Sequence, residues 1–222
     1  MDTFRVEFHC HTIVSKDSLT RPERLVEAAR QKGLQRVIIT DHNSTAGALR
    51  AQQIDPELVI VGEEIMTTRG EILAAFVTEE IPPRLTPQET IRRLRDQGAF
   101  ISVSHPFDVM RKGHWDLPDL LEIAPLVDAI ETFNSRCFNR AFNTQAQAFA
   151  QQYNLPGTVG SDAHTTFELA ISTLHLAPFA NGDDLRRVIR NGRPQTRLSL
   201  PFIQGTSRFA VIAKKLGFGK YS

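Results

Sequence analysis

The chain has 222 residues, of which 41% are hydrophobic and 23% charged, and these values are typical of a globular protein with one main domain. Its formal net charge of +1 leaves no large basic excess for neutralising nucleic-acid phosphates, so we expect a small substrate and no extended nucleic acid. Two cysteines cannot form a disulfide framework, and neither a secretory signal nor an apolar run of membrane-spanning length is recognisable. These features predict a cytoplasmic protein without a membrane span, and they say nothing about its oligomeric state.

Segments typical of strands and of helices alternate along the chain. The expected strands cover residues 4–8, 36–40, 58–61, 72–77, 99–103, 127–133 and 158–160. The expected helices cover residues 21–32, 44–53, 87–97, 117–123, 141–153 and 183–190. Such alternation predicts βαβ units in a largely parallel sheet, and about seven strands are enough to close a barrel. We expect one domain over residues 1–197, followed by a tail at 198–222 in which residues 208–216 form a short amphipathic helix.

Five of the seven histidines lie at or just after the ends of expected strands, where parallel β/α folds build their active sites. A single histidine there is usually an ordinary polar residue, but five strand ends of this kind favour one shared site. The other two histidines, His114 and His175, lie outside the pattern and are expected to be structural. The histidines of the pattern are His9, His11, His42, His105 and His164, and the acidic residues at the same strand ends are Asp41, Glu63, Glu64, Glu131 and Asp162.

The spacing within these clusters indicates metal binding. His9 and His11 are two residues apart in an extended segment, so both imidazoles project from the same face, and Asp162 and His164 repeat that spacing. Cys10 lies between the two histidines and is expected to point into the core. Imidazole and carboxylate ligands without a thiolate suit Zn²⁺, Mn²⁺ or Fe²⁺.

Six short motifs occur along the chain in the order FHCHT, TDH, GEEI, SHPF, ETFNSR and GSDAH. In this order they resemble the PHP family (polymerase and histidinol phosphatase domain), over roughly residues 5–165. The resemblance implies an α/β fold, a distorted (β/α)7 barrel of the PHP type, with two or three divalent metal ions at the C-terminal ends of its strands. The activity that it implies is the hydrolysis of phosphate esters.

The resemblance also implies three groups of metal ligands, carried over by position. Glu63 competes with Glu64 for the role of bridging ligand, but the spacing from Gly62 in the motif selects Glu64. The implied ligands are His9, His11, Glu64 and Asp162 for one metal, Glu64, His105 and either Glu131 or a neighbour of it for a second, and Asp17, His42 and His164 for a third.

The implied mechanism is direct attack of a metal-bridging hydroxide on the phosphorus of a small phosphomonoester. The expected catalytic residues are His42, His164 and Asp162, and either histidine is a candidate for protonating the leaving alkoxide. Asp41, next to His42 in the sequence, is a candidate hydrogen-bonding partner of that imidazole.

Three residues are expected to bind the phosphate group of the substrate. Arg136 follows a strand end, and its guanidinium can bind phosphate through two nitrogens; Asn134 and Lys16 are the other candidates. Arg111, Lys112 and Trp115, in the loop after SHPF, are candidates to cap the pocket, and a packing role is the more common one for a residue such as Trp115.

Two other functions fit part of the pattern. Amidohydrolase-type enzymes cleave C–N bonds on similar histidine-rich barrels, but they commonly carry a bridging lysine at a strand end, and no expected strand end here offers one. A non-catalytic metal-binding module is the second alternative, although every expected ligand position has a competent side chain. The identity of the phosphate ester and of the metal is not determined by the sequence.

Overall fold

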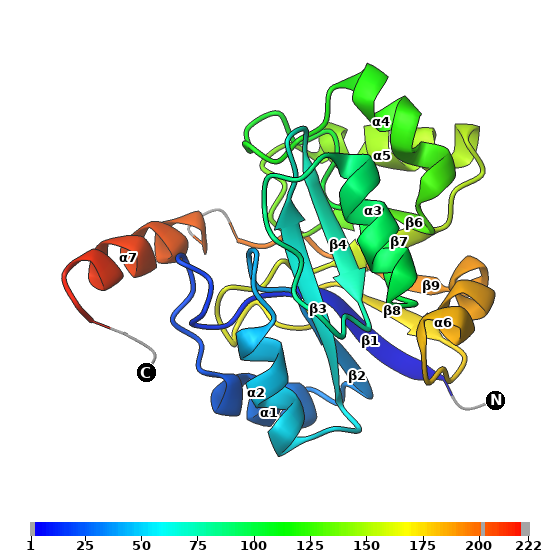
Figure 1. The fold of residues 1–222 in the computed structure, drawn as a ribbon. Coiled ribbons are helices and arrows are strands. Elements are labelled where there is room, and N and C mark those ends of the chain that lie inside the picture. The colour runs from blue at the N-terminus through cyan, green and yellow to red at the C-terminus, as the bar shows by residue number, and fades with distance from the viewer. Residues whose placement is uncertain (1–2, 201–202, 219–222) are drawn as a thin grey trace.

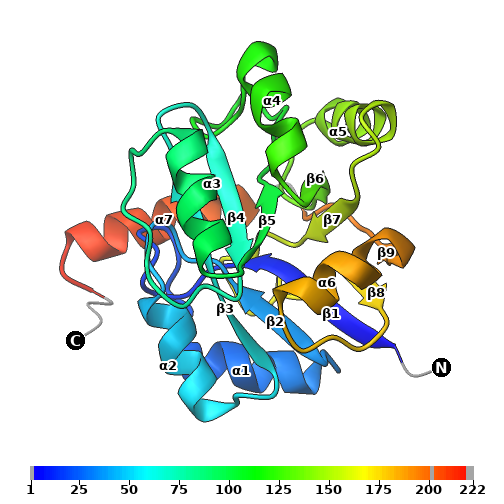
Figure 2. The same ribbon diagram turned by 45° about the vertical axis from the view of Figure 1, so that its right-hand side comes forward.

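The computed structural model describes residues 3–200 and 203–218, which form nine strands in one strongly curved sheet (Figures 1 and 2). The order of the strands in the sheet is β7-β6-β5-β4-β3-β2-β1-β8-β9. The strands are β1 (Phe4–Cys10), β2 (Arg36–Ile39), β3 (Val59–Met66), β4 (Glu71–Ala75), β5 (Phe100–Val103), β6 (Ala129–Asn134), β7 (Gly157–Gly160), β8 (Thr173–Leu176) and β9 (Arg193–Gln195).

The sheet is mixed, so the expectation of a largely parallel sheet was wrong. Strands β1–β2, β2–β3, β5–β6 and β6–β7 pair in parallel, whereas β4 runs antiparallel to both of its neighbours. The reason is local: only the short turn around Gly70 separates β3 from β4, which forces a hairpin instead of a helical crossover. Strands β8 and β9, which the sequence did not predict, add a second antiparallel extension beyond β1.

The curvature of the sheet brings its two halves together into a nearly closed barrel. The segment after β7 meets the end of β1, where the backbone N–H of His11 donates to Ala163 O at 2.8 Å and that of Ala163 donates to His9 O at 3.2 Å. The expected distorted α/β barrel is therefore the fold of this chain. The C-terminal ends of β1 and β7 lie side by side at this seam, so the polar residues that follow the two strands come close together.

Within residues 3–200 and 203–218, seven α-helices flank the sheet (Figures 1 and 2). Helices α1 and α2 pack side by side at one end of the molecule, α3, α4 and α5 lie at the other, and α7 is set apart from all of them. None of the described helices has the length and apolarity needed to cross a membrane. The helices are α1 (Pro22–Gln31), α2 (Ala46–Ile54), α3 (Pro87–Asp96), α4 (Leu117–Ile123), α5 (Arg140–Gln152), α6 (Gly182–Val188) and α7 (Ile203–Lys215).

The core has two layers because alternate residues of each strand point to opposite faces. In β2, Val37 and Ile39 pack in the cluster that contains the apolar sides of α1 to α5, whereas Ile38 packs with Phe8 and Phe100 in a second cluster. The second cluster is completed by residues of β8 and α6. These two layers hold the strand ends rigidly, which is what a site built from strand ends requires.

Candidate metal centre

The structure brings the five histidines of the sequence pattern together at one end of the barrel. His9 is in β1 and His11 follows it, while His42, His105 and His164 follow β2, β5 and β7. The ring centroid of His11 lies 4.3 Å from that of His164, 4.5 Å from that of His42 and 5.1 Å from that of His9. The ring centroids of His9 and His105 are 6.0 Å apart. The remaining two histidines are elsewhere: His114 contacts Arg111 O, and His175 contacts Gln195.

The first group of ligand-type atoms surrounds the imidazoles of His9 and His11. Their Nε2 atoms are 3.1 Å apart, and Asp162 Oδ1 lies 3.6 Å from His9 Nε2 and 3.2 Å from His11 Nε2. Glu64 closes the group, with its two carboxylate oxygens 3.4 Å from His9 Nε2 and 3.5 Å from His11 Nε2. All four side chains are buried. The competing residue Glu63 points away from this group and accepts a hydrogen bond from the backbone N–H of Ile81 at 3.0 Å.

The second group lies on the other side of Glu64. His105 Nε2 is 3.2 Å from Glu64 Oε1 and 3.3 Å from Glu71 Oε2, and the other oxygen of Glu71 is 4.0 Å from His42 Nδ1. His42, Glu64 and Glu71 have ligand atoms within 4.8 Å of one another. Sequence reasoning missed Glu71, because this residue begins an antiparallel strand and does not end a parallel one. The antiparallel register, which places Glu64 opposite Leu73, was the information that was lacking.

Glu131 lies close to the cluster but faces the back of His9. Its Oε1 is 3.0 Å from His9 Nδ1, and its Oε2 accepts hydrogen bonds from the backbone N–H of His105 at 2.9 Å and from Asn134 Nδ2 at 3.1 Å. Asn134 also donates to Asp162 Oδ2 at 3.2 Å. Both side chains are thus bonded to other members of the cluster, and the sequence assignment of Glu131 to a metal and of Asn134 to the substrate stays a prediction.

The third group contains the three residues that the resemblance had placed together. Asp17 Oδ2 lies 3.5 Å from His42 Nε2 and 3.3 Å from His164 Nε2. His11, His42 and His164 also have ring nitrogens within 4.8 Å of one another, so the third group adjoins the first. His42 links it to the second as well, because its Nδ1 is 2.9 Å from Glu64 Oε2.

A buried hydrogen-bond network supports the segment between His11 and Asp17. Asp41 accepts from the backbone N–H and Oγ1 of Thr12 at 2.7 and 2.6 Å and from Ser15 Oγ at 2.6 Å. Ser15 Oγ in turn lies 3.2 Å from His11 Nδ1. Asp41 therefore orients His11 through Ser15. The sequence had suggested the imidazole of His42 as the partner of Asp41, but among the described residues no hydrogen bond joins these two side chains.

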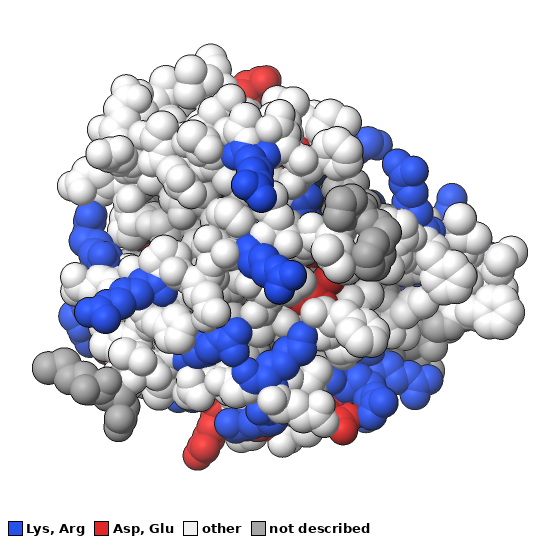
Figure 3. All heavy atoms as spheres, turned by 180° about the vertical axis from the view of Figure 1, so that it is seen from behind, with Lys and Arg blue, Asp and Glu red and all other residues white. Residues whose placement is uncertain are grey.

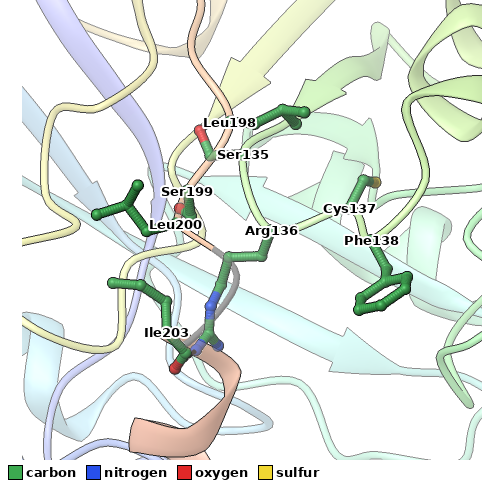
Figure 4. Close-up of a pocket in the computed structure, with 8 residues that line it drawn as sticks. All are labelled: Ser135, Arg136, Cys137, Phe138, Leu198, Ser199, Leu200 and Ile203. Carbon is green, nitrogen blue, oxygen red and sulfur yellow. Dashed lines mark hydrogen bonds between the residues drawn. The ribbon is translucent and has the colours of Figure 1, made fainter.

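Arg136 is buried and bonded to neighbouring protein groups. Its Nε is 2.8 Å from Glu168 Oε1, its guanidinium donates to Ser207 Oγ at 3.0 Å, and its Nη1 lies 2.9 Å from His164 Nδ1. Figure 4 shows this side chain running from the segment after β6 toward Ile203 at the start of α7. Arg136 also belongs, with His164, to the lining of the pocket next to the cluster.

A pocket of about 540 Å³ opens above the cluster, and Asp17, His42, Glu71 and His164 belong to its lining. Arg111 lines it too, with Nη1 2.6 Å from Asp162 Oδ2 and Nε 3.1 Å from Asp108 Oδ2. Lysine and arginine side chains also predominate over acidic ones on the face of the molecule in Figure 3, although the net charge is close to zero. Three further cations line the pocket, all exposed and without an ion pair in the part of the chain that the structure describes: Lys16, Lys112 and Arg208.

The charges in the cluster perturb one another strongly. Burial alone would lower the pKa of His9, but the carboxylates of Glu64, Asp162 and Glu131 raise it well above its usual range. Burial, together with the nearby His164 and His42, lowers the pKa of His11 to about 3. The pKa values of two neighbouring imidazoles are thus shifted in opposite directions, as expected where many titratable groups are buried together.

The donor set fits divalent metal ions. The buried Oδ1 atoms of Asp17 and Asp162 have no hydrogen-bond partner among the described residues, and His9 and His11 direct their Nε2 atoms at each other. Nitrogen and oxygen ligands that bind one tetrahedral Zn²⁺ at about 2.0–2.1 Å lie about 3.3 Å apart. The separations of 3.1–3.6 Å in the first group match that spacing.

Comparison with known proteins identifies related sequences and folds. Two family profiles match the chain, the PHP domain over residues 7–77 and a PHP-associated region over residues 140–194. An uncharacterised protein of Methanocaldococcus jannaschii is 37% identical over 168 residues, which cover 74% of this chain and 67% of the relative.

Two solved structures share the fold at low sequence identity. PsfC from Pseudomonas syringae matches with a TM-score of 0.68 and 16% identity, covering 98% of this chain and all of that one (100%). A proposed metal-dependent phosphoesterase from Bifidobacterium adolescentis matches with a TM-score of 0.60 and 18% identity, covering 81% of this chain and 91% of that one. At these identities the likeness concerns the fold alone.

Proposed function

The chain belongs to the PHP family and has the barrel fold of that family, and from this premise we propose that it is a metal-dependent phosphatase of small phosphate monoesters. The observation that carries the proposal is the position of the ligand groups. Four side chains of the second and third groups, Asp17, His42, Glu71 and His164, line a pocket that cations line as well, and the first group is buried next to them. Metal ligands and cations around one pocket together suit an anionic ester.

The rim of the pocket favours a substrate with more than one negative charge. Arg111 reaches from the rim to Asp162 and is in place to contact a phosphate oxygen bound above the first ligand group. The exposed cations Lys16, Lys112 and Arg208 lie farther out in the same lining, and they come from three separate segments of the chain. A second anionic group of the substrate would lie close to these cations in the outer part of the pocket.

Divalent metals bound by these ligands supply Lewis acidity and an activated water for attack on phosphorus. Glu64 lies between the first and second groups and we assign it to both, while Glu71 and His105 complete the second. Asn134 and Arg111 hold Asp162 in the first group. Where the third ligand group holds no metal, His42 or His164 would protonate the leaving oxygen, because both line the pocket next to the cluster.

The test is phosphate release from a panel of monoesters by chelated protein and by protein reloaded with Mn²⁺, Zn²⁺ or Fe²⁺. The panel includes histidinol phosphate, nucleoside monophosphates, a nucleoside bisphosphate and phosphotyrosine. We expect release that requires metal, that is lost in His9→Ala, and that persists in His175→Ala, a histidine substitution outside the cluster. Metal-loaded protein that releases no phosphate from any of them would overturn the proposal and direct the search to phosphodiesters and C–N bonds.

A further inference from the structure

Helix α7 lies against the rim of the barrel, apart from the other helices (Figures 1 and 2). Its inner face is made of Ile203, Ala210 and Ala213, which are buried, whereas Phe209 and Ile212 on the outer face are exposed. Small alanine side chains let the helix approach the barrel closely. The helix begins at Ile203, earlier than the start at residue 208 expected from the sequence, and its first turns add Ser207 and Arg208 to the lining of the pocket.

The C-terminal end of α7 is attached to the segment that carries Asp17. Lys214 Nζ donates hydrogen bonds to the backbone carbonyls of Ile13 and Ser15, the latter at 2.6 Å. Both carbonyls lie between His11 and Asp17 in a segment without regular secondary structure. Because the ammonium bonds to two carbonyls two residues apart, it fixes the path of this segment and with it the position of the Asp17 carboxylate.

The N-terminal end of α7 is attached to the surroundings of His164. Arg136 donates from Nη2 to Ile203 O at 3.1 Å and to Ser207 Oγ at 3.0 Å, and Figure 4 shows Arg136 next to Ile203. Its Nη1 lies 2.9 Å from His164 Nδ1, which is also 2.8 Å from Asp162 O. The same guanidinium is paired with buried Glu168, which also accepts from the backbone N–H of His164 at 3.1 Å. One end of the helix is therefore tied to His164 and the other to the segment of Asp17.

We propose that α7 assembles the third metal site, with Lys214 as its main positioning residue. The inference rests on the proposed function only in taking the three ligand groups to be metal sites. Asp17 and His164 face each other across 3.3 Å, and both are tied to the same helix by the contacts above. The first two groups take their ligands from β1 and the segment after it, β3, β4 and the segments after β5 and β7, and Ser15, whose carbonyl Lys214 binds, also lies 3.2 Å from His11 Nδ1. Loss of the α7 contacts should therefore weaken the third site most, because Asp17 and His164 are both tied to the helix.

The experiment measures the number of metal ions bound and the affinity of each. Full-length protein and its Lys214→Met variant are dialysed against a series of free Mn²⁺ concentrations, and bound metal is counted by mass spectrometry. Methionine keeps the apolar stem of the side chain and removes the ammonium. We expect Lys214→Met to bind the third equivalent roughly tenfold to a hundredfold more weakly, the usual effect of removing a group that orients a metal ligand. The first two equivalents should be weakened much less than the third.

Three further variants separate this role from a general effect on the fold. Lys215→Met alters the neighbouring exposed lysine of the same helix and should bind three equivalents with unchanged affinity. Lys214→Arg restores a cationic donor and should recover most of the third affinity. Ser207→Ala, at the other end of α7, should weaken the third equivalent most. Metal-free thermal unfolding of each variant, followed by circular dichroism, verifies that the fold is intact.

Either of two outcomes would overturn the proposal. One is three equivalents of unchanged affinity in Lys214→Met; the other is an unaltered protein that binds only two. Neither outcome uses catalysis as a readout. Failure of the proposed function would instead appear as a protein that binds its metals normally and releases no phosphate.

Discussion

Glu71 and Glu131 are both carboxylates beside the histidine cluster, but they touch different atoms. Glu71 Oε2 lies 3.3 Å from Nε2 of His105, a nitrogen that also faces Glu64, whereas Glu131 contacts Nδ1 of His9, the nitrogen on the far side of that ring. We predict that Glu71→Ala abolishes binding of the second metal at micromolar metal concentrations. Glu131→Gln should keep the number of bound metals and weaken the first by about tenfold to a hundredfold. Metal content after dialysis distinguishes the two, and the reverse ranking would assign the ligand role to Glu131.

Lys112 illustrates how an exposed charge contributes to the site. It lines the pocket and has no ion pair within residues 3–200 and 203–218. A contact between unit charges in water amounts to about 1 kcal/mol, so we predict that Lys112→Ala raises KM about fivefold and leaves kcat nearly unchanged. The effect should shrink as salt is added, because salt screens exposed charges. Steady-state kinetics at two ionic strengths measure it, with Lys215→Ala as a control outside the pocket. An unchanged KM would show that the substrate does not reach Lys112.

At the scale of elements, the contact of α2 with the end of β1 is unusually close. A Cβ atom on Gly47 of α2 would collide with Thr12 Oγ1 and Asp41 Oδ2, the pair that supports the segment before Asp17. We predict that Gly47→Ala lowers the free energy of unfolding by about 1–3 kcal/mol, even though alanine favours helix by about 1 kcal/mol.

Gly205 in α7 provides the matched comparison for Gly47. A Cβ there meets no atom within 4 Å, so Gly205→Ala should raise the free energy of unfolding by up to about 1 kcal/mol. Urea unfolding of both metal-free variants provides the test. A destabilised Gly205→Ala or a stabilised Gly47→Ala would contradict the packing described for these helices.

The loop after β5 supports β4 through one buried aromatic residue. Trp115 Nε1 donates to Glu71 O at 3.0 Å, and its ring fills the space next to Gly70. We predict that Trp115→Ala lowers the free energy of unfolding by about 3–5 kcal/mol, the usual cost of truncating a buried aromatic side chain. Because β4 begins with Glu71, binding of the second metal should weaken as well. Calorimetry and metal titration test both effects. Metal affinities equal to those of the unaltered protein would show that Glu71 does not depend on this contact.

For the whole molecule, the metal centre joins the two halves of the barrel at its seam. His9 and His11 come from one side of the seam and Asp162 from the other. Metal that binds only the folded chain at about a hundred times its dissociation constant should stabilise it by about 2.7 kcal/mol. For a chain of this size that corresponds to a rise in melting temperature on the order of 5–10 °C.

Thermal unfolding with a chelator, and again after metal is restored, measures this stabilisation. His9→Ala should respond much less, because it loses a ligand at the seam. A melting temperature that does not change on chelation would show that the metals do not bridge the two halves.

The sequence by itself determined the features that depend on local order along the chain. Helix α4 was predicted at its observed bounds and α3 to within one residue at its end, because proline, glycine and apolar spacing mark helix boundaries locally. The pairs His9 with His11 and Asp162 with His164 were recognisable because side chains two apart in extended backbone share a face. The motifs then predicted the family and the barrel, both of which the comparisons confirmed.

Only the tertiary structure decided which side chains face the ligand cluster and which support it. Glu71 enters the cluster because β4 turns back antiparallel on β3, and strand direction depends on a pairing that no local pattern encodes. Arg136 is bonded to Glu168 and to Ser207 of α7, which lie 32 and 71 residues further along the chain. Such distant pairings depend on packing, because a side chain selects its partner from the groups that the completed fold brings within reach.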